Sequence, residues 1–136
     1  MDQTGKKIRI LLSKSVQDGH ESALRYIAQT LRDAGMEVIY MRHEMIEDVV
    51  KTAAEEDVDV IGLQYFGAGV MYEVPIALDL LKQKKMEDIK VVLGGTITPD
   101  EKKTLKEMGV AEVFLPSQGK VIEIPAVIRN ILDGKQ

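Results

Sequence analysis

Short apolar runs alternate along this chain with longer stretches in which apolar residues recur at helical spacing. The short runs predict buried strands, and the longer stretches predict amphipathic helices. The predicted strands are residues 8–12, 38–40, 58–63, 89–93 and 110–114, and the predicted helices are residues 20–34, 45–56, 71–84, 99–108 and 121–132. Each predicted strand is therefore followed by a helix.

Local signals mark several of the helix ends. Gly35 follows the first helix directly, as a residue past a C-cap does. Thr98 is the expected N-cap of the fourth helix, with Pro99 at the first helical position. Pro125 falls in the early part of the last helix, so we expect that helix to start later, near Ile124.

Strict strand–helix alternation with apolar strands indicates a parallel sheet covered on both faces. The fold class is therefore α/β. We expect a flavodoxin-like, Rossmann-like doubly wound sheet of five parallel strands in the order 2-1-3-4-5, a three-layer sandwich. No linker divides the 136 residues, which predicts one domain over residues 1–136 with a core at about 7–132.

Composition narrows the possible functions. The chain has no cysteine, which excludes disulfides, thiolate metal sites and a cysteine nucleophile. The formal net charge is -4 and no basic patch is visible, which argues against nucleic acid as a partner. No apolar run approaches a membrane span, and the polar N-terminal residues do not resemble a signal peptide, so a cytoplasmic protein without a membrane partner is expected.

In such sheets ligands bind beyond the carboxyl ends of the strands, near the switch point between the first and third strands. Segments 13–20, 64–69, 94–96 and 115–119 follow the predicted strands and are expected to be loops there. Two of these segments are rich in glycine, which allows the backbone to approach a large planar ligand closely.

His20 and Asp18 are the candidate metal-site residues in the first of these segments. A histidine that ligates a metal commonly hands its other ring N–H to a carboxylate, and Asp18 is placed to accept it, with Lys14 extending the network. Spacing alone also allows Asp18 to be a helix cap and His20 a surface residue. No further ligands cluster nearby, as a zinc or iron site would require. His43 lies in a polar segment after the second strand and is expected to be solvated.

Several motifs together resemble the cobalamin-binding domains of the methylmalonyl-CoA mutase type of acyl-CoA mutases, from about residue 7 to 132. The family signature Asp-x-His-x-x-Gly corresponds to residues 18–23, which read Asp-Gly-His-Glu-Ser-Ala, and its Gly-Gly corresponds to residues 94–95. The stretches 31–40, 57–63 and 105–114 are also similar to that family.

The resemblance implies a cofactor and a site. His20 would be the axial ligand to cobalt, in place of the cofactor's own dimethylbenzimidazole, and the displaced nucleotide tail would enter a groove between the sheet and neighbouring helices. The implied cofactor-binding residues are Lys14, Asp18, Gly19, His20, Ala23, Gln64, Tyr65, Phe66, Gly67, Gly94, Gly95, Thr96, Pro116 and Ser117.

The chain departs from the family pattern on the cofactor side. Ala23 stands where the family has glycine, and residues 64–66 read Gln-Tyr-Phe where the family has Ser-x-Leu. Gln64 could still donate to the buried base, whereas Tyr65 and Phe66 are expected to crowd the groove or to stack on the corrin or the tail. Residues 116–118 read Pro-Ser-Gln in place of Pro-Gly-Thr. Either the pocket is reshaped for an unusual subtype, or cobalamin binding is weakened.

The function implied by the resemblance is that of a small subunit without catalytic residues of its own. It would present adenosylcobalamin, His-on and base-off, to a separate large acyl-CoA mutase subunit with a substrate-binding barrel, for radical 1,2-rearrangement of a short acyl-CoA. At 136 residues the chain has no room for that barrel, so we expect it to be inactive alone.

The sequence also bears on three other functions. A corrinoid carrier for methyl transfer usually has a helical cap ahead of this domain, and few residues precede the first strand here. A cobalamin sensor or a degenerate module fits the altered pocket, although the Asp18–His20 motif is intact. A phosphoacceptor receiver domain needs acidic residues at the strand ends, where this chain has Lys14 and Gln64 instead.

Overall fold

The computed structural model describes residues 7–16, 22–66, 69–115 and 119–134. Its sheet has five strands in the order β2-β1-β3-β4-β5, and every pair of neighbours is parallel. The strands are β1 (Arg9–Ser15), β2 (Glu37–His43), β3 (Val60–Phe66), β4 (Lys90–Thr96) and β5 (Glu112–Phe114). The predicted fold class and strand order are confirmed.

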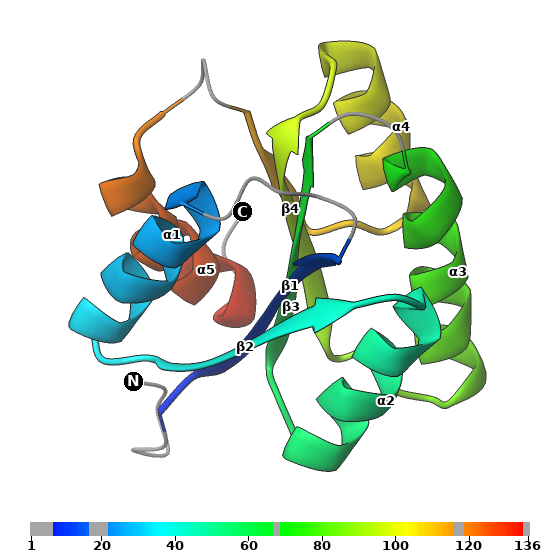
Figure 1. The fold of residues 1–136 in the computed structure, drawn as a ribbon, viewed down its shortest axis with the longest axis horizontal. Helices are drawn as coiled ribbons and strands as arrows, with labels where there is room; N and C mark the ends of the chain where they lie inside the picture. Colours follow the sequence, from blue (N-terminus) through cyan, green and yellow to red (C-terminus); the bar gives the residue numbers. More distant parts are fainter. Residues whose placement is uncertain (1–6, 17–21, 67–68, 116–118, 135–136) are drawn as a thin grey trace.

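Helices cover both faces of this sheet (Figure 1). The helices are α1 (Ser22–Asp33), α2 (Ile46–Glu56), α3 (Val70–Gln83), α4 (Pro99–Met108) and α5 (Ile124–Leu132), and a 3-10 turn, Val121–Glu123, precedes α5. Helices α1 and α5 lie on one face, and α2, α3 and α4 lie on the other. Thr98 caps α4 through a capping box with Glu101, and α5 starts at Ile124, both as predicted.

The central strands run farther than the apolar runs predicted. Ser13 to Ser15, Gln64 to Phe66 and Gly94 to Thr96 were expected in loops, yet they are the last residues of β1, β3 and β4. Their backbones stay paired: Lys14 is in register with Arg42, and Gln64 with Gly94. Because pairing continues past the apolar run, these residues alternate between the two faces of the sheet.

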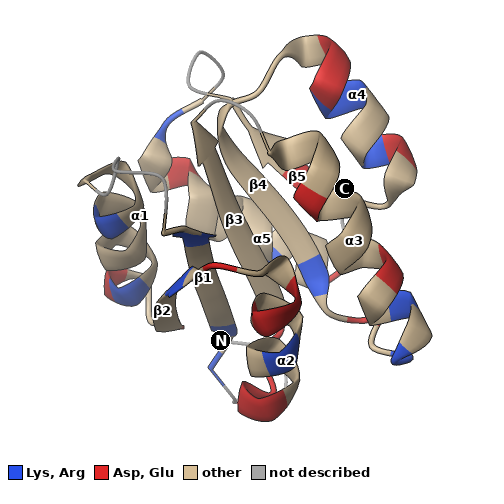
Figure 2. Cartoon of the chain, turned by 45° about the vertical axis from the view of Figure 1, so that its right-hand side comes forward, with Lys and Arg blue, Asp and Glu red and all other residues tan. Residues whose placement is uncertain are grey.

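Each face of the sheet buries its own apolar cluster. Ile10, Leu12 and Val60 pack with α1 and α5, whereas Leu11, Ile61 and Leu63 pack with α2 and α3. Charged residues occupy the outer helices, where α2 and α4 carry both signs interspersed (Figure 2). Within the described ranges, no helix has the length and apolar character needed to cross a bilayer.

Candidate functional site

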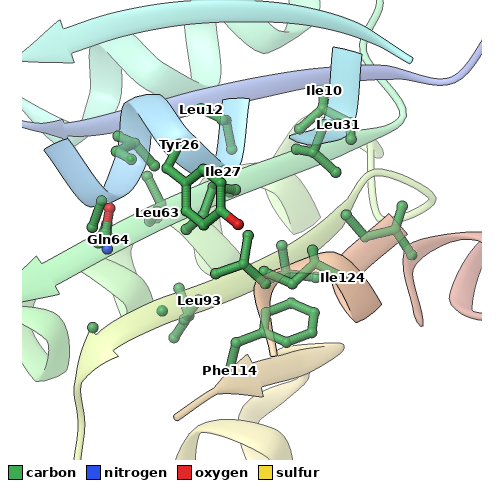
Figure 3. Close-up of a pocket in the computed structure, with 18 of the residues that line it drawn as sticks. Ile10, Leu12, Tyr26, Ile27, Leu31, Leu63, Gln64, Leu93, Phe114 and Ile124 are labelled. Atoms are coloured by element: carbon green, nitrogen blue, oxygen red, sulfur yellow. The ribbon is translucent and has the colours of Figure 1, made fainter. Parts of the chain in front are cut away.

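A cavity of about 290 Å³ lies between the sheet and helices α1 and α5 (Figure 3). Its walls are mostly apolar and include Ile10 and Leu12 of β1, Leu31 of α1 and Ile128 of α5. The cavity reaches the carboxyl ends of β3 and β4, where Gln64, Phe66, Gly94 and Gly95 line it. It therefore occupies the place at which doubly wound sheets bind ligands.

Gln64 brings an amide into this apolar space. The residue is 6% exposed, and its Oε1 has no hydrogen-bond partner among the described residues. Figure 3 shows the amide at one end of the cavity, pointing in from β3. A buried acceptor without a donor carries an uncompensated desolvation free energy, and a bound molecule that donates to Oε1 would offset it.

Two adjacent glycines of β4 shape the same wall. Gly95 has a φ of +114°, and a Cβ there would lie 1.9 Å from the carbonyl oxygen of Tyr65, so no side chain fits. Among the described residues, a Cβ on Gly94 would come within 4 Å of the Phe114 carbonyl oxygen alone, at 3.7 Å. Gly95 thus allows β3 and β4 to pair closely, while Gly94 keeps space in the cavity.

Aromatic side chains concentrate around the cavity. Tyr26, Phe66 and Phe114 line it, which is three of the six phenylalanine and tyrosine residues of the chain. Tyr26 is 60% exposed, and its ring extends from α1 over the cavity (Figure 3). The sequence analysis missed Tyr26 and Phe114; the scarcity of aromatics in the chain was the one signal that could have pointed to them.

Tyr65 lies on the opposite face of the sheet. Its hydroxyl donates to Glu73 Oε1 of α3 at 2.9 Å, and its side chain does not line the cavity. The expectation that Tyr65 crowds the groove is wrong, since β3 alternates and, of residues 64–66, Gln64 and Phe66 line the cavity while Tyr65 does not. Burial, with the nearby Glu73 charge adding to it, raises the pKa of the Tyr65 hydroxyl, so this group remains a donor.

His43 is buried and not solvated, which corrects the expectation from the sequence. It is the last residue of β2 and only 1% exposed. Its Nδ1 lies 2.6 Å from Ser13 Oγ, and its Nε2 lies 3.0 Å from Glu73 Oε1. Ser13, His43, Glu73 and Tyr65 thus form one polar network, called here the β1–α3 network, beneath the carboxyl edge of the sheet.

The same edge anchors the end of β1, which leads toward the predicted ligand segment. Val16 donates its backbone N–H to the His43 carbonyl at 2.9 Å, and Arg42 Nη2 donates to the Val16 carbonyl at 2.8 Å. Lys14 is fully buried within this strand end. By alternation it shares the face of Leu12, on the side of the cavity.

The remaining predicted site residues divide into two groups. Ala23 lies at the start of α1 and lines the cavity, and Thr96 is the exposed last residue of β4. Asp18, Gly19, His20, Gly67, Pro116 and Ser117 lie outside the described residues. In the parts of the chain that the structure describes, no three metal-binding side chains come together.

Comparison with known proteins identifies the family. The sequence profile of the B12 binding domain matches residues 8–124. The chain belongs to the B12-binding domain family. The resemblance found in its motifs is therefore confirmed at the level of the family.

Two relatives are named as small subunits of mutases. The 2-hydroxyisobutanoyl-CoA mutase small subunit of Aquincola tertiaricarbonis is 37% identical over 94% of this chain and 96% of its own length. The pivalyl-CoA mutase small subunit of Xanthobacter autotrophicus is 39% identical over 85% of this chain and 78% of its own length. Both matches extend over most of the two proteins compared.

A solved structure shares the fold of this B12-binding domain. A cobalamin-binding protein from Desulfitobacterium hafniense superposes with a TM-score of 0.74 at 17% identity, over 93% of this chain and 60% of the other. At that identity the likeness shows the fold alone.

The cavity has the properties that the nucleotide tail of a cobalamin requires. It is apolar, it is flanked by aromatic rings, and the Gln64 amide lies at one end of it. Gly94 leaves part of the wall without a side chain at the carboxyl edge. The described residues therefore fit the cofactor of the family, whose tail would be held by Gln64, Tyr26 and the β4 glycines.

Proposed function

We propose that this chain is the cobalamin-binding small subunit of an acyl-CoA mutase. It carries adenosylcobalamin to a separate large subunit, whose barrel holds a short acyl-CoA for 1,2-rearrangement. Two relatives named as mutase small subunits match most of the chain, which supports this role. When bound, adenosylcobalamin supplies radical chemistry through its cobalt–carbon bond.

In this proposal His20 is the lower axial ligand to cobalt, and Asp18 and Lys14 orient it. The contacts of the second histidine, His43, support this assignment. The chain has two histidines, and both ring nitrogens of His43 are within hydrogen-bonding distance of Ser13 or Glu73 inside the protein. His43 is therefore unavailable to a metal, and His20 is the imidazole left to bind cobalt.

The residues of this chain would then bind and position the cofactor. The anchored end of β1 fixes the start of the segment that carries His20, through the contacts of Val16 with His43 and Arg42. The residues that line the cavity would hold the nucleotide tail. The apolar walls would exclude water from the tail, and Gln64 would offer a polar contact at the carboxyl edge of the sheet.

The test uses protein labelled with nitrogen-15 only in histidine. Cob(II)alamin is added, and the axial nitrogen splitting is read by electron paramagnetic resonance. Because only two histidines carry the label and one is buried, a change in the splitting on labelling reports His20. The splitting should revert to that of free cofactor in His20→Ala and remain in the matched control Ser22→Ala, an exposed position at the start of α1.

Two results would overturn the proposal. Labelled wild type that binds cob(II)alamin without any change in splitting would exclude histidine ligation. Wild type that binds no cobalamin at high micromolar concentration, alone or with a mutase large subunit, would exclude the cobalamin role altogether.

A further inference from the structure

The amide oxygen of Gln64 lies in the apolar cavity without a hydrogen-bond donor from the described residues. This atom, Oε1, is buried, and the residue is only 6% exposed. Native proteins seldom bury an acceptor in this way unless a bound ligand or an ordered water supplies the donor. A ligand that fills the cavity should therefore carry an N–H or O–H group beside Gln64, at the carboxyl edge of the sheet.

The aromatic lining of the cavity favours a flat ring. Tyr26, Phe66 and Phe114 come from three different elements, α1, β3 and β5, and all line the cavity, as Gln64 does. Aromatic rings bind a planar base by stacking, with little preference among bases. Stacking on these rings would contribute affinity for any base, so discrimination between bases would have to come from the Gln64 amide.

An amide presents an acceptor and a donor side by side. Glutamine pairs with adenine through both, because adenine carries an N–H donor next to a ring-nitrogen acceptor. The dimethylbenzimidazole of cobalamin has ring nitrogens but no N–H or O–H donor on its substituents. It would accept from Nε2 of Gln64 and leave Oε1 without a donor.

We propose that Gln64 selects the base of the corrinoid tail, favouring a base with a donor beside an acceptor, such as adenine, over dimethylbenzimidazole. This inference rests on the proposed function, because it places the nucleotide tail in the cavity. Gln64 is then a specificity-determining residue of the cofactor site. This selectivity would explain why the chain has Gln64 where the family has the serine of Ser-x-Leu.

The test compares three corrinoids by equilibrium dialysis against the full chain: cobinamide, which has no base, cobalamin, and the cobamide that carries adenine. Wild type should bind the adenine cobamide about tenfold more tightly than cobalamin, because an unpaired buried acceptor costs that much. Gln64→Leu keeps similar volume without the amide, and should bind cobalamin at least as tightly as the adenine cobamide. Cobinamide should bind equally to both proteins.

Equal affinity of wild type for the two complete corrinoids, or tighter binding of cobalamin, would overturn the inference and leave the proposed function standing. The same conclusion would follow if Gln64→Leu kept the wild-type preference. Failure of wild type to bind any of the three corrinoids would instead remove the proposed function. The two failures are therefore distinguishable in one set of measurements.

Discussion

His43 and Glu73 meet beneath the carboxyl edge of the sheet, with Nε2 of the histidine 3.0 Å from Oε1 of the glutamate. The pair joins the end of β2 to the first turn of α3. The same glutamate oxygen accepts from the Tyr65 hydroxyl, and the far side of the imidazole contacts Ser13. One carboxylate therefore satisfies two donors that are hidden from water.

Removing that carboxylate should destabilise the fold. In Glu73→Leu, the Tyr65 hydroxyl and His43 Nε2 lose their common acceptor, and we expect the free energy of unfolding to fall by about 2 kcal/mol or more. Glu73→Gln retains a carbonyl oxygen and should lose less than half as much. Urea unfolding with linear extrapolation measures both. A leucine variant within 0.5 kcal/mol of wild type would show that the β1–α3 network contributes little.

The two β4 glycines should respond differently to alanine. Gly95→Ala places a Cβ against the Tyr65 carbonyl at a positive φ, so we expect a loss of more than about 3 kcal/mol or failure to fold. Gly94→Ala meets no close contact and should cost less than about 1 kcal/mol. Thermal unfolding of the two variants side by side makes the comparison. Equal losses would contradict it.

The methyl group of Gly94→Ala should still matter for cofactor binding. It projects into the cavity wall, so we expect cobalamin affinity to fall about tenfold through crowding of the tail. Cobinamide, which lacks the tail, should bind as it does to wild type. A parallel loss for both corrinoids would mean that the substitution acts outside the cavity.

Tyr26 should contribute to tail binding and little to stability. Because 60% of the residue is exposed, Tyr26→Ala should change the free energy of unfolding by less than about 1 kcal/mol. The ratio of cobalamin to cobinamide affinity should fall about tenfold, since stacking on one base is worth roughly 1–3 kcal/mol. Tyr26→Phe keeps the ring and is the matched control. An unchanged ratio in Tyr26→Ala would place the base away from this ring.

Glu112 should make the protein less stable in acid. Burial alone would raise its pKa, but the Val113 N–H, Lys102 and Lys106 together lower it below its ordinary value. The unfolded chain therefore takes up the proton first, and the stabilisation is present above the unfolded pKa of about 4.3 and is lost as pH falls through the folded pKa. Urea midpoints from pH 6 to 3 should fall more for wild type than for Glu112→Gln. Parallel curves would assign the acid sensitivity to other carboxylates.

The positions of the strands and helices could be predicted from the sequence because each depends on a local period. The strand order followed from their strict alternation, for which 2-1-3-4-5 is a common order. The apolar runs also located the carboxyl edge, where Gln64 and the β4 glycines proved to line a cavity. The true strand ends could not be read in this way. Gln64 and Thr96 look like loop residues by composition, and only pairing with neighbouring strands keeps them extended.

His43 was missed for a related reason. From the sequence alone, a histidine between Arg42 and Glu44 is expected to be solvated, because a buried histidine needs partners for both ring nitrogens. Those partners, Ser13 and Glu73, each lie 30 positions away in the chain. No local pattern connects the three residues, whereas the parallel register of β1 and β2, which pairs Ser13 with Met41 and Ser15 with His43, puts Ser13 and His43 on the same face of adjacent strands.

The alternation of Gln64 and Tyr65 along β3 also limits how this protein can evolve. One side chain faces the cavity and the next is tied to Glu73 on the other face. An insertion or deletion of one residue within β3 would exchange the two faces, sending the phenol toward the ligand and the amide into the core. Relatives that change their choice of ligand should therefore do so by point substitution at the cavity-facing positions, with the length of this strand held constant.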